Sequence, residues 1–520
     1  MVRTRWIFLR GLAAIFLIAF VSLWSQVDGL IGSHGILPAA ELMNQAADRI
    51  PGRIDILPTL AWFSSGDVFL HALCASGVLA SLAALAGIAE SLSFFVLWVL
   101  YLSLAVVSSE FLSFQWDNLL LETGFLAVFF APCRWRPRWT QERIPPIVSL
   151  WLLRWLLFRL MFESGLVKLL SGDPAWRDLT ALQYHFETQP LPTWLGWYAH
   201  QLQSAVLKGT TGAMFAIELV VPFFIFLGRS FRLAAALFFI GFQIIIGATG
   251  NYGFFNLLTI LLCLPLLDDD FIEAPGRFIL RLWRKMRQKL RKRFAQEEVS
   301  ETQSRAVRAP RKLRSSRLAS VMSIPLAALV IIVSGTEMVR LTIGRAAMPG
   351  FLVDIVEAVS PFRSINRYGL FAVMTTHRPE LVVEGSWDGL TWKEYEFKWK
   401  PGSLAQPPRF VEPHMPRLDW QMWFAALGRC EHNPWFQRFE EKLLEGSPPV
   451  LGLLKNDPFA GQSPNFIRTD VYEYHFTDPA AKSQQGTWWR REYRSPYCPM
   501  TAKTPIDGSG QKDLYLGPTE

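Results

Sequence analysis

The residues most able to do chemistry in this chain lie beside apolar runs that are long enough to cross a membrane. The stretch 110–125, EFLSFQWDNLLLETGF, carries Gln115, Asp117, Asn118 and Glu122 at the edge of one such run. Hydrocarbon offers no partner to a polar group, so these side chains need partners from the protein. They are therefore candidates for a functional site or for contacts that hold helices together.

Further polar residues are predicted at the same depth. Glu163 and Lys168 approach the outer end of the next apolar run, and Asn251 and Asn256 begin a later one. A lysine desolvated among apolar helices can lose its proton near neutral pH and act as a base, with Glu163 or Glu122 tuning it. The candidate polar cluster comprises Gln115, Asp117, Asn118, Glu122, Glu163, Lys168, Asn251 and Asn256.

Three other charged residues in these runs are expected to have structural roles. Arg154 and Arg159 lie deeper in the run 147–170, and Glu218 lies in a later run. Arg159 and Glu163 are four residues apart, so they can pair along one helix face. Such pairs satisfy polar groups inside a helical bundle without any catalytic role.

The motifs of common enzymes and cofactor sites are missing from the sequence. His185 and His200 lack the spacing of HExxH and have no cysteine partners, so no metal site is expected. The chain has no G-x-S-x-G, no Walker A loop and no Rossmann glycine fingerprint. We therefore expect no cofactor and assign no catalytic residue from a motif, and a protein without enzymatic activity is favoured.

The composition indicates an integral membrane protein with a water-soluble C-terminal part. Of 520 residues, 51% are hydrophobic and only 18% are charged, against about 25% charged in soluble domains. Nearly all long apolar runs precede residue 345. At membrane-span length they predict nine helices. Their approximate ranges are 11–24, 68–88, 94–112, 118–133, 147–170, 212–228, 233–249, 253–267 and 322–342.

The basic segments predict the orientation of these spans. With nine crossings and a cytoplasmic N-terminus, the basic segments all fall on the cytoplasmic side, as the positive-inside rule requires. The loops 25–66 and 171–211 and the C-terminal part then fall outside. The net charge of +8 comes mostly from the loop 268–320, so nucleic acid is not an expected partner. The basic segments are 1–10, 134–143, 229–232 and 277–317.

Residues 345–520 predict a β-rich α+β domain. The run 381–399 alternates and has Asp388-Gly389 at its centre, which is typical of a hairpin, and residues 470–476 and 487–493 also alternate. Residues 418–428 and 434–444 have helical spacing. The expected fold is thus an all-α multi-span membrane bundle over 1–344 followed by an extracytoplasmic domain.

Two features of this domain bear on its surroundings and its partners. Cys430 and Cys498 could pair if the domain is extracytoplasmic. Aromatic side chains could contact a client protein, although most tryptophans in such a domain lie in its core. The candidate contact residues are Trp387, Trp392, Trp420 and Trp423.

Several stretches together resemble the lipase maturation factor family. They are FQWDNLLLETGFLAVFFAP (114–132), RLMFESGLVKLLSGDPAWRDLTALQYHFETQPLPTW (159–194), NYGFFNLLTILLCLPLLDD (251–269), SPFRSINRYGLFAVMTTHRPELVVEGSWDG (360–389) and PHMPRLDWQMWFAALG (413–428). The resemblance implies a multi-span protein that helps secreted lipases to fold and assemble. It further implies a secreted client protein and the lipid bilayer as partners. The membrane would be the endoplasmic reticulum in a eukaryote and the cytoplasmic membrane in a bacterium.

A more remote resemblance suggests an enzymatic alternative. The segment SGLVKLLSGDPAW (164–176) is similar to the segment around the catalytic base lysine of the vitamin K-dependent γ-carboxylase superfamily. Lys168 falls at the position of that base. The resemblance would imply a membrane enzyme that uses Lys168 as a base, which differs from a folding factor that holds its client through the exterior domain.

Overall fold

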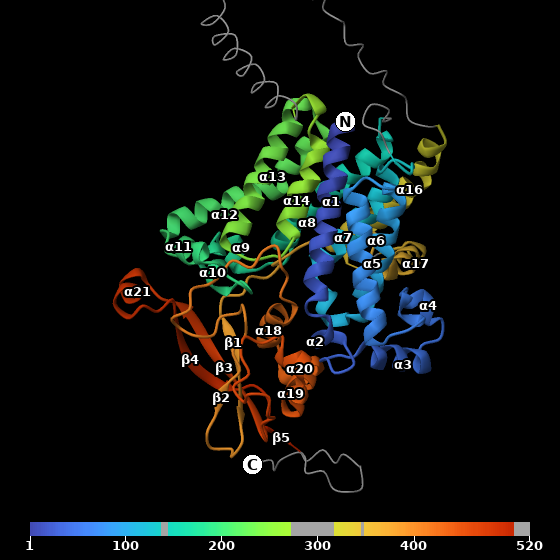
Figure 1. The fold of residues 1–520 in the computed structure, drawn as a ribbon. Coiled ribbons are helices and arrows are strands. Elements are labelled where there is room, and N and C mark those ends of the chain that lie inside the picture. The colour runs from blue at the N-terminus through green and yellow to red at the C-terminus, as the bar shows by residue number, and fades with distance from the viewer. Residues whose placement is uncertain (137–143, 272–316, 345–347, 504–520) are drawn as a thin grey trace, which may run out of the picture.

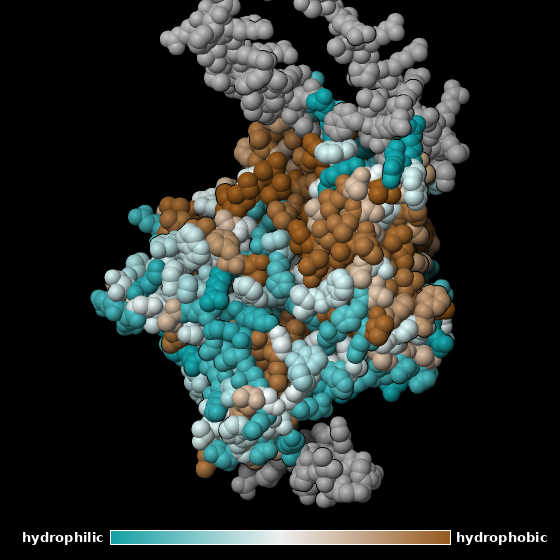
Figure 2. Space-filling model, in the orientation of Figure 1, coloured by the Kyte–Doolittle hydropathy of each residue, from teal (hydrophilic) through white to brown (hydrophobic). Residues whose placement is uncertain are grey.

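The computed structural model describes residues 1–136, 144–271, 317–344 and 348–503 (Figure 1). Most of the basic loop predicted at 268–320, part of 134–143 and the last seventeen residues lie outside the described residues. A helical bundle forms one end of the molecule and a small sheet domain the other (Figure 1). In Figure 2 hydrophobic residues cover the bundle, whereas hydrophilic residues dominate the sheet domain.

Six helices among the described residues are long and apolar enough to cross a membrane. Each corresponds to one of the nine predicted spans. Their sequences are apolar around most of the helix, which is typical of a membrane span. The six are α1 (Val2–Trp24), α5 (Asp67–Leu85), α6 (Glu90–Val107), α12 with η4 (Ser204–Phe226), α13 (Arg229–Thr249) and the range Ile324–Ile343 of α16 (Arg317–Ile343).

The other three predicted spans also form helices, but they are not typical spans. Helix α7 (Gln115–Phe130) has 16 residues and α14 (Phe255–Cys263) has nine. Helix α8 (Ile147–Leu170) is long enough but carries Arg154, Arg159, Glu163 and Lys168. The six apolar helices are therefore established as candidate spans, and the total of nine stays a prediction.

Short helices connect the spans at the end of the bundle that faces the sheet domain (Figure 1). The first connection packs against α6 through Leu60, whose backbone N–H donates to Ser103 Oγ at 3.0 Å. The second connection precedes α12. The short helices are α2 (Val27–Ile31), α3 (Ala39–Arg49), α4 (Arg53–Ile56), η1 (Leu60–Trp62), η2 (Ser109–Leu112), α9 (Pro174–Arg177), α10 (Leu182–Thr188) and α11 (Trp194–His200).

The C-terminal domain is built on an antiparallel sheet in the order β2–β1–β3–β4, with β5 also paired to β3. The hairpin predicted around Asp388-Gly389 is confirmed, because Glu384 of β1 pairs with Glu394 of β2. The strands predicted at 470–476 and 487–493 are confirmed as well. The strands are β1 (Pro379–Ser386), β2 (Lys393–Glu394), β3 (Phe466–Phe476), β4 (Trp489–Pro496) and β5 (Thr501–Ala502).

Helices pack between this sheet and the bundle. The two predicted helices form as α18 (Arg417–Leu427) and α19 (Pro434–Glu445), and α18 packs on β1. Cys430 and Cys498 form a disulfide that joins the short helix before α19 to the segment after β4. The remaining helices of this part are α17 (Gly350–Val359), η7 (Ser360–Phe362), η8 (Cys430–His432), α20 (Pro448–Leu451) and α21 (Pro479–Gln485).

The two parts share one continuous core. Trp420 of α18 contacts Phe114 and Trp116 of the bundle, with ring centroids 5.9 and 4.6 Å apart. Phe111 contacts Trp435 of α19 in the same way. The C-terminal domain is therefore packed against the end of the bundle by buried aromatic residues, which contribute the largest apolar areas to such contacts.

Candidate functional site: the polar junction of bundle and domain

The polar residues at the edge of α7 meet the C-terminal domain. Arg417 donates two hydrogen bonds to the carboxylate of Asp117, at 2.6 and 2.7 Å. Tyr101 donates to the same carboxylate at 2.6 Å. All three side chains are fully buried. A bidentate arginine–carboxylate pair fixes the orientation of both partners, so it sets how α18 lies on the bundle.

One helical turn further into α7, Glu122 meets the segment that leads into the sheet. Glu122 Oε1 pairs with Arg159 of α8. Glu122 Oε2 accepts hydrogen bonds from the backbone N–H of Asn366, at 2.9 Å, and from Tyr368 Oη, at 2.7 Å. Arg159 also donates to the carbonyl of Asn366 at 2.7 Å. The segment at Asn366–Tyr368 thus completes an ion pair between two bundle helices.

Glu163 and Gln115 bind the backbone of the same segment. Tyr368 N–H donates to Glu163 Oε2 at 2.8 Å. Gln115 exchanges two hydrogen bonds with Gly369, because Nε2 donates to its carbonyl at 2.8 Å and Oε1 accepts from its N–H at 3.0 Å. The carbonyl of Asn118 accepts from the side chain of Asn366 at 3.2 Å. The bundle thus binds both the backbone and the side chains of this segment.

Asn251 and Asn256 hold a third segment of the C-terminal domain. Asn251 Oδ1 accepts from Val411 N–H and Asn251 Nδ2 donates to the carbonyl of Arg409, both at 2.8 Å. Glu412 accepts from Asn256 Nδ2 at 3.3 Å and from the backbone N–H of Tyr252. Burial raises the pKa of Glu412 to about 7, because the charged carboxylate loses its water.

Lys168 forms its hydrogen bonds within the helical bundle. Its Nζ lies 2.8 and 3.0 Å from the two carboxylate oxygens of Glu218 on α12 and donates to the carbonyl of Ser164 at 3.0 Å. The Lys168 and Glu218 side chains are each 6% exposed. Lys168 is therefore engaged in a buried ion pair, and neither Glu163 nor Glu122 is its carboxylate partner. Arg159, expected to pair with Glu163, forms its ion pair with Glu122 instead.

The structure separates the four candidate contact tryptophans into two pairs. Trp420 and Trp423 are buried, so their assignment as exposed contacts is corrected. The physical reason is that α18 lies between the sheet and the bundle, where Trp423 Nε1 also donates to the carbonyl of Thr188 at 2.8 Å. Trp387 is 43% exposed beside the hairpin turn. Trp392 is half-buried under the guanidinium of Arg468, at 4.3 Å from its ring centroid.

The sequence did not identify the residues that the bundle's polar groups bind. Asn366, Tyr368 and Gly369 lie in the stretch 360–389, and Arg417 lies in PHMPRLDW, both of which carry the family resemblance. That resemblance was the available signal, but it does not say which stretches meet. Glu412 was not singled out by any pattern.

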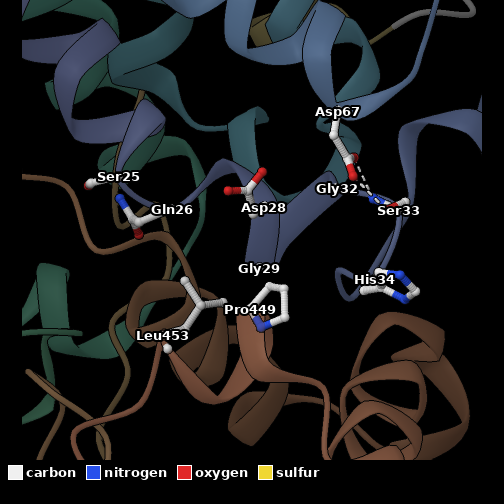
Figure 3. Close-up of a pocket in the computed structure, with 11 residues that line it drawn as sticks. Ser25, Gln26, Asp28, Gly29, Gly32, Ser33, His34, Asp67, Pro449 and Leu453 are labelled. Atoms are coloured by element: carbon white, nitrogen blue, oxygen red, sulfur yellow. Dashed lines mark hydrogen bonds between the residues drawn. The ribbon is translucent and has the colours of Figure 1, made fainter.

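A cavity of about 270 Å³ lies beside this junction, between the α1–α2 region and α20 (Figure 3). Gln26 lines it and also accepts a hydrogen bond from the backbone N–H of Arg417 at 2.8 Å. Other polar groups beside the cavity bind one another: Ser33 donates to both oxygens of Asp67, at 2.7 and 2.5 Å, and His71 lies 3.0 Å from Asp28. Among the residues that the structure describes, no group of three or more His, Cys, Asp or Glu side chains could hold a metal ion.

The fold and the junction define an integral membrane protein whose helical bundle is bound to a small C-terminal α+β domain. The family model described as "Lipase maturation factor transmembrane domain" matches residues 3–274. The model described as "Lipase maturation factor C-terminal domain" matches residues 364–499. The chain belongs to the lipase maturation factor family, which confirms the resemblance. Both matched regions contribute residues to the junction.

Individual relatives cover nearly the whole chain. It is 37% identical to lipase maturation factor 2 of Xenopus tropicalis, over 95% of this chain and 81% of the relative. It is 37% identical to lipase maturation factor 2 of Homo sapiens, over 96% and 82%. It is 34% identical to lipase maturation factor 1 of Bos taurus, over 97% and 90%. No solved structure matches the chain.

Proposed function

We propose that this chain is a membrane-bound maturation factor that assists the folding and assembly of secreted lipases. The observation that carries the proposal is the family match over both the membrane part and the C-terminal domain. The similar proteins are named for lipase maturation, and this chain covers more than four fifths of each of those compared above. The bundle holds the protein in the membrane, and the C-terminal domain presents a surface to the client.

The proposed extracytoplasmic position of the C-terminal domain is supported by charge. The N-terminal amine pairs with Asp269, Arg229 lies 2.9 Å from Asp268, and Ala89 N–H donates to the carbonyl of Trp135. These contacts place the described residues of three basic segments, 1–10, 134–136 and 229–232, at the end of the bundle opposite to the sheet (Figure 1). By the positive-inside rule that end is cytoplasmic.

The disulfide supports the same orientation. Cys430 and Cys498 are bonded within the C-terminal domain, and disulfides persist in the endoplasmic reticulum lumen or the periplasm rather than in the cytosol. We accordingly place the protein in the endoplasmic reticulum membrane of a eukaryote or the cytoplasmic membrane of a bacterium. Either compartment is the one in which a secreted client folds.

In this proposal the polar junction holds the C-terminal domain in the orientation in which it meets the client. Three segments of the C-terminal domain bind carboxylate, amide and guanidinium groups of the bundle, at Asn366–Gly369, Arg409–Glu412 and Arg417. Buried polar contacts have strict geometry, so they fix the domain in one orientation on the membrane. The enzymatic alternative is not favoured, since Lys168 forms a closed pair with Glu218.

The test is lipase maturation in cells that lack their own maturation factor. Co-expression with the intact chain should raise secreted lipase activity per unit of lipase protein. Deletion of residues 345–520 should abolish this increase. Equal lipase activity with the intact and the shortened chain, at equal membrane levels, would overturn the proposal.

A double substitution tests the proposal without a large deletion. Trp387 and Leu390 are 43% and 84% exposed at the β1–β2 turn, and they are the proposed client contacts. The double substitution Trp387→Ala and Leu390→Ser should lower lipase maturation while the chain remains folded. Met500→Ser is the matched control, because Met500 is an apolar side chain that is 58% exposed elsewhere in the domain.

A further inference from the structure

The connection between α3 and α5 exposes an unusual amount of apolar surface. Ile54, Ile56, Phe63 and Val68 are 66%, 51%, 84% and 86% exposed within fifteen residues. Water-soluble surfaces seldom gather large apolar side chains in this way unless the patch has a partner. We call residues 53–68 the exterior apolar segment. Figure 1 shows α3 and α4 standing out sideways from the end of α5 that faces the C-terminal domain.

One side of the exterior apolar segment is fixed to the bundle. Thr59 Oγ1 donates to the carbonyl of Ser103 on α6 at 3.0 Å, and Trp62 Nε1 donates to the carbonyl of Leu57 at 2.9 Å. Leu57, Leu60 and Trp62 pack against the main core. The segment is therefore attached to the bundle by Thr59 and by the packing of these three residues.

The exposed residues continue the lipid-facing stripe of a membrane span. On α5 the exposed positions recur at helical spacing, at Val68, Ala72, Ser76, Leu79 and Leu82. The opposite side of α5 packs on α1 and α6. Because α5 is a candidate span, lipid covers this stripe, which begins at Val68 in the first turn of the helix. Phe63, four residues before α5, is exposed as well.

We propose that the exterior apolar segment inserts into the outer leaflet at the level of the lipid headgroups and acts as an interfacial anchor. Its occupant is phospholipid, because the segment is continuous with the lipid-covered face of α5. Trp62 and Phe63 supply aromatic side chains at the boundary, where membrane proteins concentrate such residues. Such an anchor would hold the connection between α1 and α5 at the membrane surface, beside the C-terminal domain.

Spin-label accessibility in phosphatidylcholine nanodiscs tests the proposal on the full chain. The background variant is Cys133→Ser, since Cys133 is the exposed free cysteine among the described residues and Cys74 and Cys263 are buried. Single labels are placed by Phe63→Cys and Ile56→Cys. Leu390→Cys is the aqueous control, because Leu390 has the same 84% exposure as Phe63. Leu79→Cys on α5 is the lipid control.

The proposal predicts that labels at positions 63 and 56 collide with oxygen several-fold more, relative to a water-soluble nickel chelate, than the label at position 390. Their ratios should approach that of position 79. A ratio at position 63 equal to that at 390 would overturn the proposal. If that water-exposed label then became immobile on addition of a lipase, the segment would be a client contact instead.

Discussion

Arg417 and Asp117 are 300 residues apart in the sequence, yet two hydrogen bonds of 2.6 and 2.7 Å join their side chains inside the protein. Asp117 belongs to the membrane bundle and Arg417 begins α18 of the C-terminal domain. Neither side chain is more than 1% exposed. This pair is one of the points at which the C-terminal domain is joined to the membrane bundle.

Removing one member of this pair should be far more damaging than removing both. Arg417→Met leaves Asp117 buried without its cation, and we expect a loss of about 3–5 kcal/mol in the free energy of unfolding. The double variant Asp117→Leu with Arg417→Met should recover most of that loss, because no charge is left buried. Thermal unfolding in nanodiscs and limited proteolysis of the C-terminal domain measure both variants.

The matched control is a surface pair in the same domain. Arg429 and Glu431 are 77% and 68% exposed with 3.3 Å between them. Arg429→Met should cost less than about 1 kcal/mol, since water screens exposed ion pairs. Equal losses for Arg417→Met and Arg429→Met would show that the Asp117 pair does not hold the domain in place.

Gly369 should not tolerate a side chain. Its φ of +151° is rarely adopted by other residues, and a Cβ atom there would lie 2.6 Å from Val167 on α8. Gly369→Ala should therefore destabilise the domain–bundle contact by about 1–3 kcal/mol and weaken the two hydrogen bonds to Gln115. Gly402→Ala is the control, because a Cβ atom there meets nothing within 4 Å. The rates at which trypsin cleaves the two variants measure this difference, and Gly369→Ala should be cleaved faster.

Substitutions in the buried pair of Lys168 and Glu218 can distinguish a structural role of Lys168 from a functional one. Lys168→Met alone should lower the amount of folded protein, since Glu218 is left unpaired. Adding Glu218→Leu should restore both the protein level and lipase maturation if the pair is structural. Restored folding without restored maturation would instead indicate that Lys168 takes part in function. Membrane protein level by immunoblot, alongside secreted lipase activity, distinguishes these outcomes.

Local patterns were enough to predict the elements of the fold. Runs of apolar residues located every helix of the bundle that the structure describes as a candidate span, because membrane spans need continuous apolar sequence. Alternation around Asp388-Gly389 located the β1–β2 hairpin for a similar reason, since strand side chains alternate between two faces.

The partners of the polar residues could not be predicted in the same way. Asp117 and Glu122 are polar residues in apolar surroundings, which indicates that they need partners but not which residues those partners are. Those partners, Arg417, Asn366 and Tyr368, lie 244 to 300 residues away along the chain. Only the tertiary fold brings such residues together. The same reason explains why Lys168 was grouped with Glu163 on its own helix, although it pairs with Glu218 on α12.

Glu440 should make the stability of the C-terminal domain depend on pH. Glu440 is 2% exposed, and burial raises its pKa from 4.5 to about 7. Between pH 4.5 and 7 the folded protein keeps a proton that the unfolded chain gives up, so stability rises as the pH falls through this range. Above pH 7 the charged carboxylate stays buried, at a cost on the order of 3 kcal/mol.

The substitution Glu440→Gln removes this cost without removing the acceptor that Thr469 Oγ1 donates to, at 2.5 Å. The variant should therefore be more stable than the parent protein at pH 8, and the difference should shrink toward pH 5. Thermal unfolding at pH 5, 6.5 and 8 measures this difference, with Glu445→Gln at a half-exposed position as the control. If the difference in stability between the parent protein and Glu440→Gln were the same at pH 8 and pH 5, Glu440 would be accessible to water. The packing of α19 on β3 would then be looser than in the structure.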